Sequence, residues 1–209
     1  MTSHATLRTA VGPDDHVAGP ANAPVTLVEY GDYQCPYCGQ AHPILKALQA
    51  RMGDRLRLVF RNFPLTELHP NALHAAEAAE SVAEQAGPDA FWAMHDTLYE
   101  HQHSLDDVHL VRYAAALGAD GDRVSSDLAE VAHEERIRAD FMSGVRSGVN
   151  GTPTFFINGD RFEGDWTDLA AFAAALESAA RPAVADVGGG SPRGIGEVPR
   201  SQPRGELRM

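Results

Sequence analysis

Cys35 and Cys38 are the only cysteines of the sequence, and Pro36 and Tyr37 separate them. A pair with this spacing can attack a disulfide with one thiolate and resolve the mixed disulfide with the second thiol. The same spacing occurs in half of a zinc ribbon, but this chain has no second cysteine pair. A zinc site would need His42, four residues after Cys38, and a distant histidine. Redox chemistry is therefore the favoured interpretation, and a redox-sensing or zinc-holding binding module is the alternative.

The order of the two thiols predicts which one is the nucleophile. We expect Cys35 at the N-terminus of a helix, where unpaired N–H groups and the helix dipole stabilise a thiolate. Pro36 suits the first helical turn, because its missing N–H leaves no hydrogen bond unmade there. Cys38 would lie one turn further in and be more buried, which makes it harder to ionise. The sequence thus predicts Cys35 as the attacking thiol and Cys38 as the resolving thiol.

The segments on either side of the cysteines predict the elements that position them. Residues 25–30 are rich in β-branched and aromatic side chains, as expected of a strand, and lead into the cysteine motif. Apolar residues then recur at helical spacing up to Gly53, and residues 56–60 have the composition of a second strand. A strand, a helix and a strand in this order indicate a βαβ unit with parallel strands.

The middle of the chain is predicted to be helical, and strands return after it. Residues 154–157, the turn sequence Asn158-Gly159 and residues 161–163 together predict a β-hairpin. The helices are expected, from their apolar spacing and from likely breaks at glycine, over the ranges 70–86, 89–101, 108–117 and 122–147.

A last helix and a polar tail complete the chain. Thr167 or Asp168 can cap the N-terminus of this helix. After Arg181 the sequence is rich in glycine, proline and arginine and has little to bury, so disorder is predicted there. The side chains expected to face inward from the last helix are Leu169, Phe172 and Leu176.

Composition excludes several classes of function. The formal charge of −12 argues against a protein that binds nucleic acid by neutralising phosphates. No stretch approaches the roughly 18 apolar residues of a membrane span, and no secretory signal is visible at the start. We therefore expect a cytoplasmic protein that binds neither nucleic acid nor membrane.

Three blocks of sequence resemble DsbA-like thioredoxin-fold proteins, and they fall in the order of that family. The first runs from 25 to 38, and the second is Phe60-Arg61-Asn62-Phe63-Pro64-Leu65, followed by a histidine-proline pair and an alanine-rich helix. The third is residues 148–159, which contain Thr152-Pro153. The resemblance covers about 25–176 and is much more specific than the cysteine spacing alone.

This resemblance implies an α/β, thioredoxin-like fold with an all-helical insertion between a βαβ half and a C-terminal ββα half. The implied domain spans residues 25–180. A lead-in at 1–24 precedes it, the helical insertion occupies about 66–147, and a disordered tail at 181–209 follows. The only redox group implied is the Cys35–Cys38 disulfide itself, with no other cofactor and no metal.

The resemblance also implies roles for particular residues. Thr152-Pro153 matches the loop whose proline is cis and lies opposite the active-site disulfide, where an extended substrate peptide can pair with the backbone. Pro36 and Tyr37 would share in substrate binding. Glu29 matches a buried acid near the resolving cysteine, which could take the proton of that thiol. The expected partners are protein or small-molecule thiols and disulfides, with a further redox partner that recycles the site.

Tyr37 departs from the most oxidising relatives, which carry a histidine at this place. A tyrosine offers the thiolate no positive charge, so a middling reduction potential is expected. A glutathione-dependent isomerase of small aromatic acids is a second enzymatic alternative, weakened by the retention of both cysteines. The histidines near the motif are expected to be helix-surface or helix-start residues without a catalytic role: His42, His69, His74 and His95.

Overall fold

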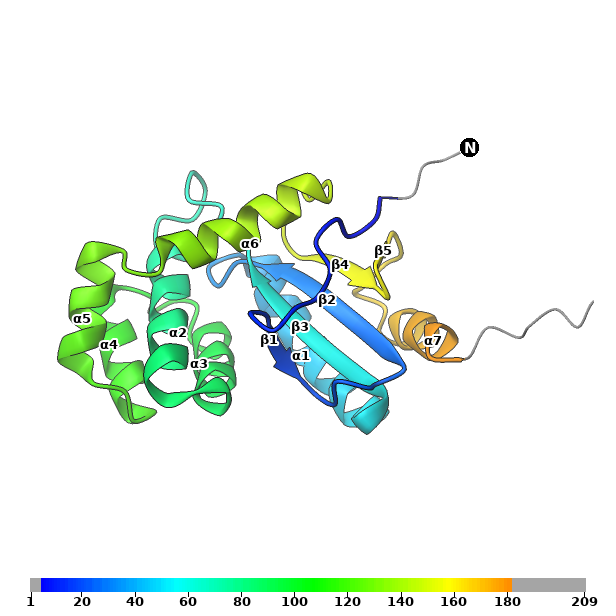
Figure 1. Cartoon of the computed structure of the whole chain (residues 1–209), viewed down its shortest axis with the longest axis horizontal. Coiled ribbons are helices and arrows are strands. Elements are labelled where there is room, and N and C mark those ends of the chain that lie inside the picture. The colour runs from blue at the N-terminus through cyan, green and yellow to red at the C-terminus, as the bar shows by residue number, and fades with distance from the viewer. Residues whose placement is uncertain (1–4, 182–209) are drawn as a thin grey trace, which may run out of the picture.

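A computed structural model of the chain describes residues 5–181 and contains one five-stranded mixed sheet flanked by helices (Figure 1). The strand order is β1-β3-β2-β4-β5. β2 and β3 are parallel, as expected for a βαβ unit, and the other neighbouring pairs are antiparallel. The strands are β1 (His16–Ala18), β2 (Val25–Gly31), β3 (Leu56–Asn62), β4 (Thr154–Ile157) and β5 (Asp160–Arg161).

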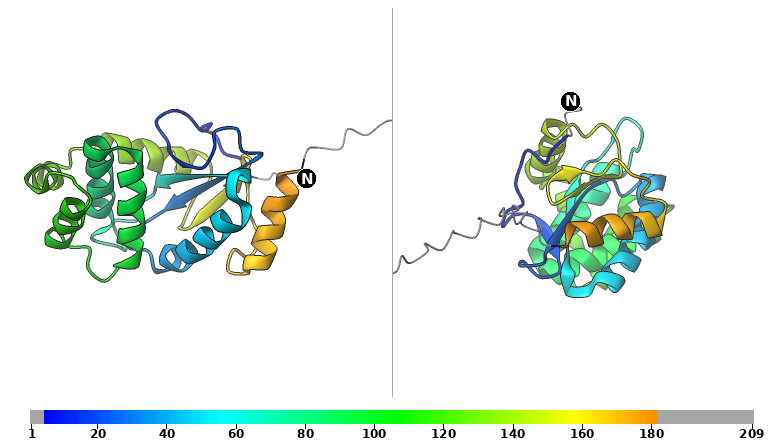
Figure 2. Two further views of the ribbon diagram at one scale, coloured as in Figure 1. Left: turned by 90° about the horizontal axis from the view of Figure 1, so that it is seen from below. Right: turned by 90° about the vertical axis from the view of Figure 1, so that its right-hand side faces the viewer.

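Helices cover both faces of this sheet. α1 (Pro36–Met52) and α7 (Leu169–Ala179) lie on one face, and α6 (Glu134–Arg146) and the N-terminal segment lie on the other (Figure 2). Because side chains alternate along a strand, Val25, Leu27 and Glu29 of β2 point toward α1, whereas Val28 and Tyr30 point toward α6. This alternation directs a carboxyl group toward the helix that carries the cysteines.

The remaining helices form a bundle beside one end of the sheet (Figure 1). Its apolar core is continuous with Tyr33, Cys35 and Cys38, so the bundle also packs against the cysteine motif. The bundle follows β3 in the chain and is followed by β4, which agrees with the expected helical insertion. Its helices are α2 (Ala72–Ala86), α3 (Pro88–Glu100), α4 (Asp107–Ala116) and α5 (Gly121–Glu130), and α6 leads from the bundle back across the sheet.

Three local expectations differ from the structure. The lead-in contains the short edge strand β1, which pairs with β3. The single helix expected over 122–147 is two helices, because Val131 has a left-handed backbone with φ of 49° and Glu77 caps the second helix by accepting a 2.7 Å hydrogen bond from the His133 N–H. Leu169 is the first residue of α7 and is 40% exposed, whereas Phe172 and Leu176 are buried.

The disorder expected over 181–209 falls outside the described residues, apart from Arg181. Within residues 5–181 no helix combines the length and the apolar character that crossing a membrane requires.

Candidate active site

Cys35 and Cys38 open helix α1 in the geometry expected from their spacing. Cys35 is the N-cap residue with an extended backbone, and Pro36 occupies the first helical turn. The two sulfurs are not joined by a disulfide in this structure, and the exposed fractions are 3% for Cys35 and 0% for Cys38. The helix is anchored behind them by inward side chains at helical spacing, namely Ala41, His42, Leu45, Leu48 and Met52.

The two thiols differ sharply in acidity. The pKa of Cys35 falls to about 5, chiefly because the Cys38 thiol donates a hydrogen bond to it. Burial opposes this shift, and the Thr152 side chain and the backbone N–H groups of Tyr37 and Cys38 add to it. The pKa of Cys38 is raised well above its ordinary value, first by burial and then by its hydrogen bond to Cys35. Cys35 is therefore the thiol that is ionised at neutral pH, as the nucleophile must be.

This difference predicts selective alkylation of the reduced protein. At pH 7 iodoacetamide should label Cys35 at least ~100-fold faster than Cys38, because only a thiolate reacts. The labelling rate of Cys35 should rise with pH through a midpoint of about 5. Replacing Cys38 with alanine removes the main hydrogen-bond donor and should raise that midpoint. A midpoint of about 8.5, the pKa of an ordinary cysteine, in both the wild type and Cys38→Ala would contradict the assignment of Cys35 as the acidic thiol.

The loop at Thr152 and Pro153 lies against Cys35. The peptide bond between these two residues is cis, and the Cys35 Sγ–H group donates to the Thr152 carbonyl at 3.4 Å. The Thr152 hydroxyl is buried and has no hydrogen-bond partner within the described part of the chain. When Cys35 ionises, this hydroxyl can donate to the thiolate, which accounts for its effect on the Cys35 pKa.

Glu29 is buried on the α1 side of the sheet, 1% exposed. Neither of its carboxyl oxygens has a hydrogen-bond partner among residues 5–181. Burial, and secondarily the negative charge of Cys35, raises the pKa of Glu29 to about 8. The acidity of Cys38 is in turn lowered by the charge of Glu29. The charges of the two groups therefore influence each other, although neither Glu29 oxygen hydrogen-bonds to the Cys38 thiol.

Asp32 holds the start of α1 in place, a role that the sequence analysis missed. Its Oδ1 accepts hydrogen bonds from the N–H groups of Gln34 at 2.8 Å and Cys35 at 3.2 Å. Its Oδ2 accepts from the Leu65 N–H at 2.8 Å and pairs with Nδ1 of His69 at 2.7 Å. An aspartate a few residues before a helix start is a recognisable capping signal, and it could have identified this residue.

Gln102 clamps the motif from the helical insertion. Its side-chain Nε2 donates to the backbone carbonyls of Tyr33 and Cys35, both at 2.8 Å. A Cβ on Gly39 would meet the side-chain amide of Gln102, so a larger residue at that place in α1 would displace this amide from its hydrogen bonds. No local pattern indicates this contact, because Gln102 lies in the loop after α3, 67 residues from Cys35.

The residues expected to bind substrate surround the Cys35 thiol. Pro36 and Tyr37 are exposed, and the side chain of Tyr37 reaches 59% exposure. Thr152 and Pro153 are half-buried on the other side of Cys35. The exposed side chains of Pro36 and Tyr37 and the loop at Thr152 and Pro153 thus flank the Cys35 thiol.

Two of the four histidines near the motif differ from their expected positions, whereas His69, just before α2, and His74, on the surface of α2, agree with them. His42 and His95 are buried rather than on the helix surface, with exposed fractions of 8% and 2%. His69 pairs with Asp32, as described above. His74 is partly exposed and pairs with Asp107 at 2.6 Å.

A family model described as thioredoxin matches residues 12–178, which include both cysteines, Glu29 and Pro153. The chain belongs to the thioredoxin family. Within this thioredoxin family, the helical insertion between β3 and β4 is the DsbA-like form of the fold. The resemblance and the fold class predicted from the sequence are therefore confirmed.

Solved structures share this fold. BdbD from Bacillus subtilis, in its oxidised form, superposes with a TM-score of 0.75 at 23% identity, over 85% of this chain and 98% of that one. α-DsbA1 from Wolbachia pipientis gives 0.70 at 19% identity, over 81% and 92%. A thioredoxin-like oxidoreductase from Silicibacter pomeroyi gives 0.67 at 26% identity, over 80% and 93%. These similarities establish the thioredoxin-like architecture with its helical insertion.

Curated relatives are more similar in sequence than these solved structures, and they are named as antiporters and not as oxidoreductases. A protein named Na(+)/H(+) antiporter NhaA 3 from Salinispora tropica is 45% identical over 94% of this chain, and NhaA 1 from Salinispora arenicola is 47% identical over 83%. This thioredoxin-family chain covers only 30% and 26% of those two proteins. It therefore spans less than a third of the length of the curated relatives that it matches.

Proposed function

We propose that this chain is a thiol–disulfide oxidoreductase that exchanges disulfides with protein or small-molecule thiols through Cys35 and Cys38. The observation that carries the proposal is the unequal acidity of the two thiols at the start of α1, with a Cys35 pKa of about 5 beside a Cys38 pKa above the ordinary range. A purely structural cysteine pair has no need of this difference.

In the reducing direction, the Cys35 thiolate attacks one sulfur of a substrate disulfide. The substrate S–S bond breaks, a Cys35–substrate disulfide forms and the first substrate sulfur leaves as a thiolate. The Cys38 thiolate then attacks Sγ of Cys35 and releases the second substrate thiolate. The Cys35–Cys38 disulfide is the oxidised product, and two electrons have passed to the substrate. Oxidation of a substrate dithiol is the reverse of these steps.

Glu29 is proposed to take the proton of Cys38 as that thiol attacks. A carboxylate whose conjugate acid has a pKa of about 8 is a much stronger base than an exposed glutamate. At pH 7 about a tenth of Glu29 is ionised on this value, which is sufficient for a base that recovers its proton in each cycle. Thr152 and Pro153 would position the substrate backbone, and Pro36 and Tyr37 would contact its side chains.

The acidity of Cys35 also bears on the direction of exchange. A stabilised thiolate favours the reduced enzyme and so makes the disulfide more oxidising. A pKa of about 5 is lower than the ~7 of thioredoxin and higher than the ~3.5 of DsbA. We therefore propose a reduction potential between about −270 and −120 mV, the values of those two proteins. The cytoplasmic location remains a prediction from the sequence.

The proposal is tested by an insulin-reduction assay with dithiothreitol as the electron donor. The wild-type chain should accelerate insulin precipitation, and Cys35→Ser should abolish this activity. Cys38→Ser should accumulate a mixed disulfide with the substrate, whereas Cys35→Ser should accumulate none. Equal trapping by both variants would refute the assigned roles. Equilibration with glutathione buffers would then give the potential and decide the favoured direction.

A second candidate is suggested by the curated relatives, which carry the name of antiporters. We propose as the alternative that a domain of this kind acts as a redox-sensing module attached to or docked on an ion transporter. In that case the chain would show no turnover, and its binding to antiporter-containing membranes would change on oxidation of Cys35 and Cys38. Turnover with insulin and no binding to such membranes would exclude this candidate.

A further inference from the structure

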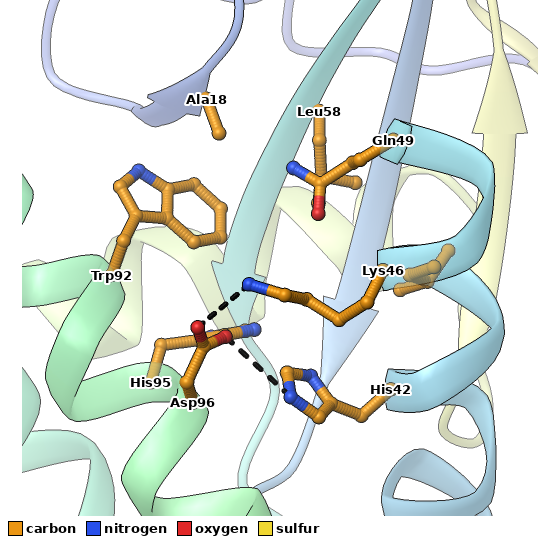
Figure 3. Close-up of a pocket in the computed structure, with 9 residues that line it drawn as sticks. Ala18, His42, Lys46, Gln49, Leu58, Trp92, His95 and Asp96 are labelled. Atoms are coloured by element: carbon orange, nitrogen blue, oxygen red, sulfur yellow. Dashed lines mark hydrogen bonds and ion pairs between the residues drawn. The ribbon is translucent and has the colours of Figure 1, made fainter. Parts of the chain in front are cut away.

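A small cavity between α1 and α3 brings together two histidines and an aspartate (Figure 3). His42 extends from α1, four residues after Cys38, and His95 and Asp96 extend from α3. The cavity measures about 100 Å³, which is large enough for an ion and a water molecule. Leu58 of the sheet and the indole of Trp92 form apolar walls around these polar groups. None of these residues takes part in the disulfide exchange proposed above.

His95 is prepared to act as a ligand. Only 2% of the residue is exposed, and its Nδ1 lies 3.2 Å from the Tyr33 hydroxyl. Its Nε2 has no hydrogen-bond partner in the part of the chain that the structure describes. Burial, followed by the charges of His42 and Lys46, keeps the pKa of His95 well below its ordinary value. When Tyr33 accepts the Nδ1 proton, the Nε2 lone pair is free, an arrangement that outer-shell hydrogen bonds impose on metal-binding histidines.

His42 and Asp96 complete a set of three donors. Nε2 of His42 lies 3.5 Å from Oδ1 of Asp96. Burial lowers the pKa of His42, so its imidazole is also neutral near pH 7. One candidate ligand atom from each of the three residues lies within 4.8 Å of the others. Ligand atoms about 2.0–2.2 Å from a tetrahedral zinc ion lie about 3.4 Å from one another. Small side-chain rotations that move these atoms by about 1 Å would bring the three residues to that spacing.

Lys46 occupies the position that a cation would take. Its Nζ lies 2.7 Å from Oδ2 of Asp96, and its side chain is 52% exposed (Figure 3). A flexible, half-exposed ammonium can swing into water at little cost, because an ion pair of this exposure contributes at most about 1 kcal/mol. The carboxylate would then neutralise a metal ion in place of the lysine.

We propose that His42, His95 and Asp96 bind a zinc ion, with Lys46 displaced and a water molecule as the fourth ligand. Imidazole and carboxylate are ligands that zinc accepts, and three protein ligands with one open position are typical of zinc sites that are not purely structural. The ion would connect the helix that carries the cysteines to the helical insertion.

The site is tested by titrating Zn²⁺ into the full chain carrying Cys35→Ser and Cys38→Ser, which removes the two thiols as competing ligands. Isothermal titration should give one zinc per chain, and the melting temperature should rise with Zn²⁺ concentration. In this background His95→Gln should weaken zinc binding at least tenfold. Lys46→Met should strengthen binding severalfold, up to about fivefold, because the competing ammonium, worth at most about 1 kcal/mol, is gone while the three ligands remain.

His103→Gln is the matched control, since His103 is exposed and lies in the loop after α3. It should leave zinc affinity unchanged. Absence of zinc binding in the cysteine-free chain would overturn the proposal, and so would equal affinities of the parent, His95→Gln and Lys46→Met proteins. Lys46 is on the surface, so its variant keeps the test decisive even if His95→Gln disturbs folding. Zinc binding here and insulin reduction by the unmodified chain are measured separately, so failure of one leaves the other intact.

Discussion

Replacing Glu29 with methionine is expected to stabilise the reduced protein by roughly 3 kcal/mol at pH 7. The carboxyl group is 1% exposed and its two oxygens have no partner within residues 5–181, so its charged form is strongly disfavoured in the folded chain. Burial, with the charge of Cys35 second, raises its pKa from 4.5 to about 8. Each pH unit from 4.5 up to the pKa in the folded chain costs the folded state about 1.4 kcal/mol. The interval from 4.5 to 7 therefore gives the expected gain of roughly 3 kcal/mol at pH 7.

The stability gained by Glu29→Met should depend on pH in a way that identifies the ionisation of Glu29 as its cause. Below pH ~4.5 the glutamate is protonated in both the folded and the unfolded chain, so its ionisation costs nothing. Between pH 4.5 and about 8 the unfolded chain releases the proton while the folded chain retains it, and stability falls as pH rises. The advantage of Glu29→Met over the wild type should therefore grow through this window and level off above it.

Urea unfolding of the reduced proteins at pH 4.5, 7 and 9 measures this prediction. Glu130→Met is the matched control, because Glu130 is exposed on α5 and should leave stability nearly unchanged at every pH. A Glu29→Met protein with the same pH dependence as the wild type would show that Glu29 ionises normally.

The same substitution should also slow the resolution of mixed disulfides by about 100-fold, since Cys38 loses its base. Quench-flow measurement of the lifetime of the Cys35–substrate disulfide would record this delay. A gain in stability with an unchanged lifetime would leave Glu29 as a buried acid without a role in proton transfer. The two readouts therefore separate the electrostatic effect of Glu29 from its proposed role in catalysis.

The sheet and the cysteine helix could be predicted because their signals are local. β2 and β3 are short β-branched and apolar runs, and α1 begins at a proline and repeats its apolar residues at helical spacing. β1 escaped prediction because His16–Ala18 is too short to show a pattern. The break at Val131 was missed because Glu77, distant in sequence, caps the next helix. Elements fixed by their own residues were predicted, whereas features fixed by distant partners were not.

The residues of the candidate site also fall into those that local sequence predicts and those that depend on distant contacts. The spacing of Cys35 and Cys38 and the block around Pro153 are visible in the sequence, and their predicted positions follow from it. Gln102 reaches the motif from a loop whose sequence has no marker of that contact. The sequence predicts His95 on a helix surface, but the residue is buried. Its burial could not be predicted because it depends on how α3 packs against α1 and the sheet.

Replacing Arg61 with methionine is expected to destabilise the protein by about 3–5 kcal/mol. Arg61 is 2% exposed, and its guanidinium forms a two-pronged pair with Asp15 at 2.7 and 2.9 Å. The other N–H groups donate to the Tyr30 hydroxyl and to the carbonyls of Thr9 and Ala10. Removing this one side chain leaves the buried Asp15 carboxylate without its countercharge and takes a donor from three further acceptors, the situation in which a broken ion pair is most costly.

Thermal unfolding should register this loss as a fall in melting temperature of about 10 °C or more. Arg51→Met is the matched control, because Arg51 pairs with Glu177 on the surface at 2.9 Å and its side chain is 52% exposed. That pair should contribute less than about 1 kcal/mol. If both arginine variants unfold at the same temperature, the pairing of Arg61 with the N-terminal segment contributes no more than a surface contact.

The pH dependence of the Arg61 effect distinguishes the ion pair from simple packing. Burial opposes ionisation of Asp15, but its bonds to Arg61 and the Gly12 N–H outweigh burial and leave the pKa of Asp15 lowered. The stability that comes from this lowered pKa is present above the unfolded value of about 4 and is lost as pH falls through the folded value. The cost of Arg61→Met should therefore shrink below pH ~4. Combining it with Asp15→Leu should recover much of the loss at pH 7, because a buried pair replaced on both sides leaves no unpaired charge.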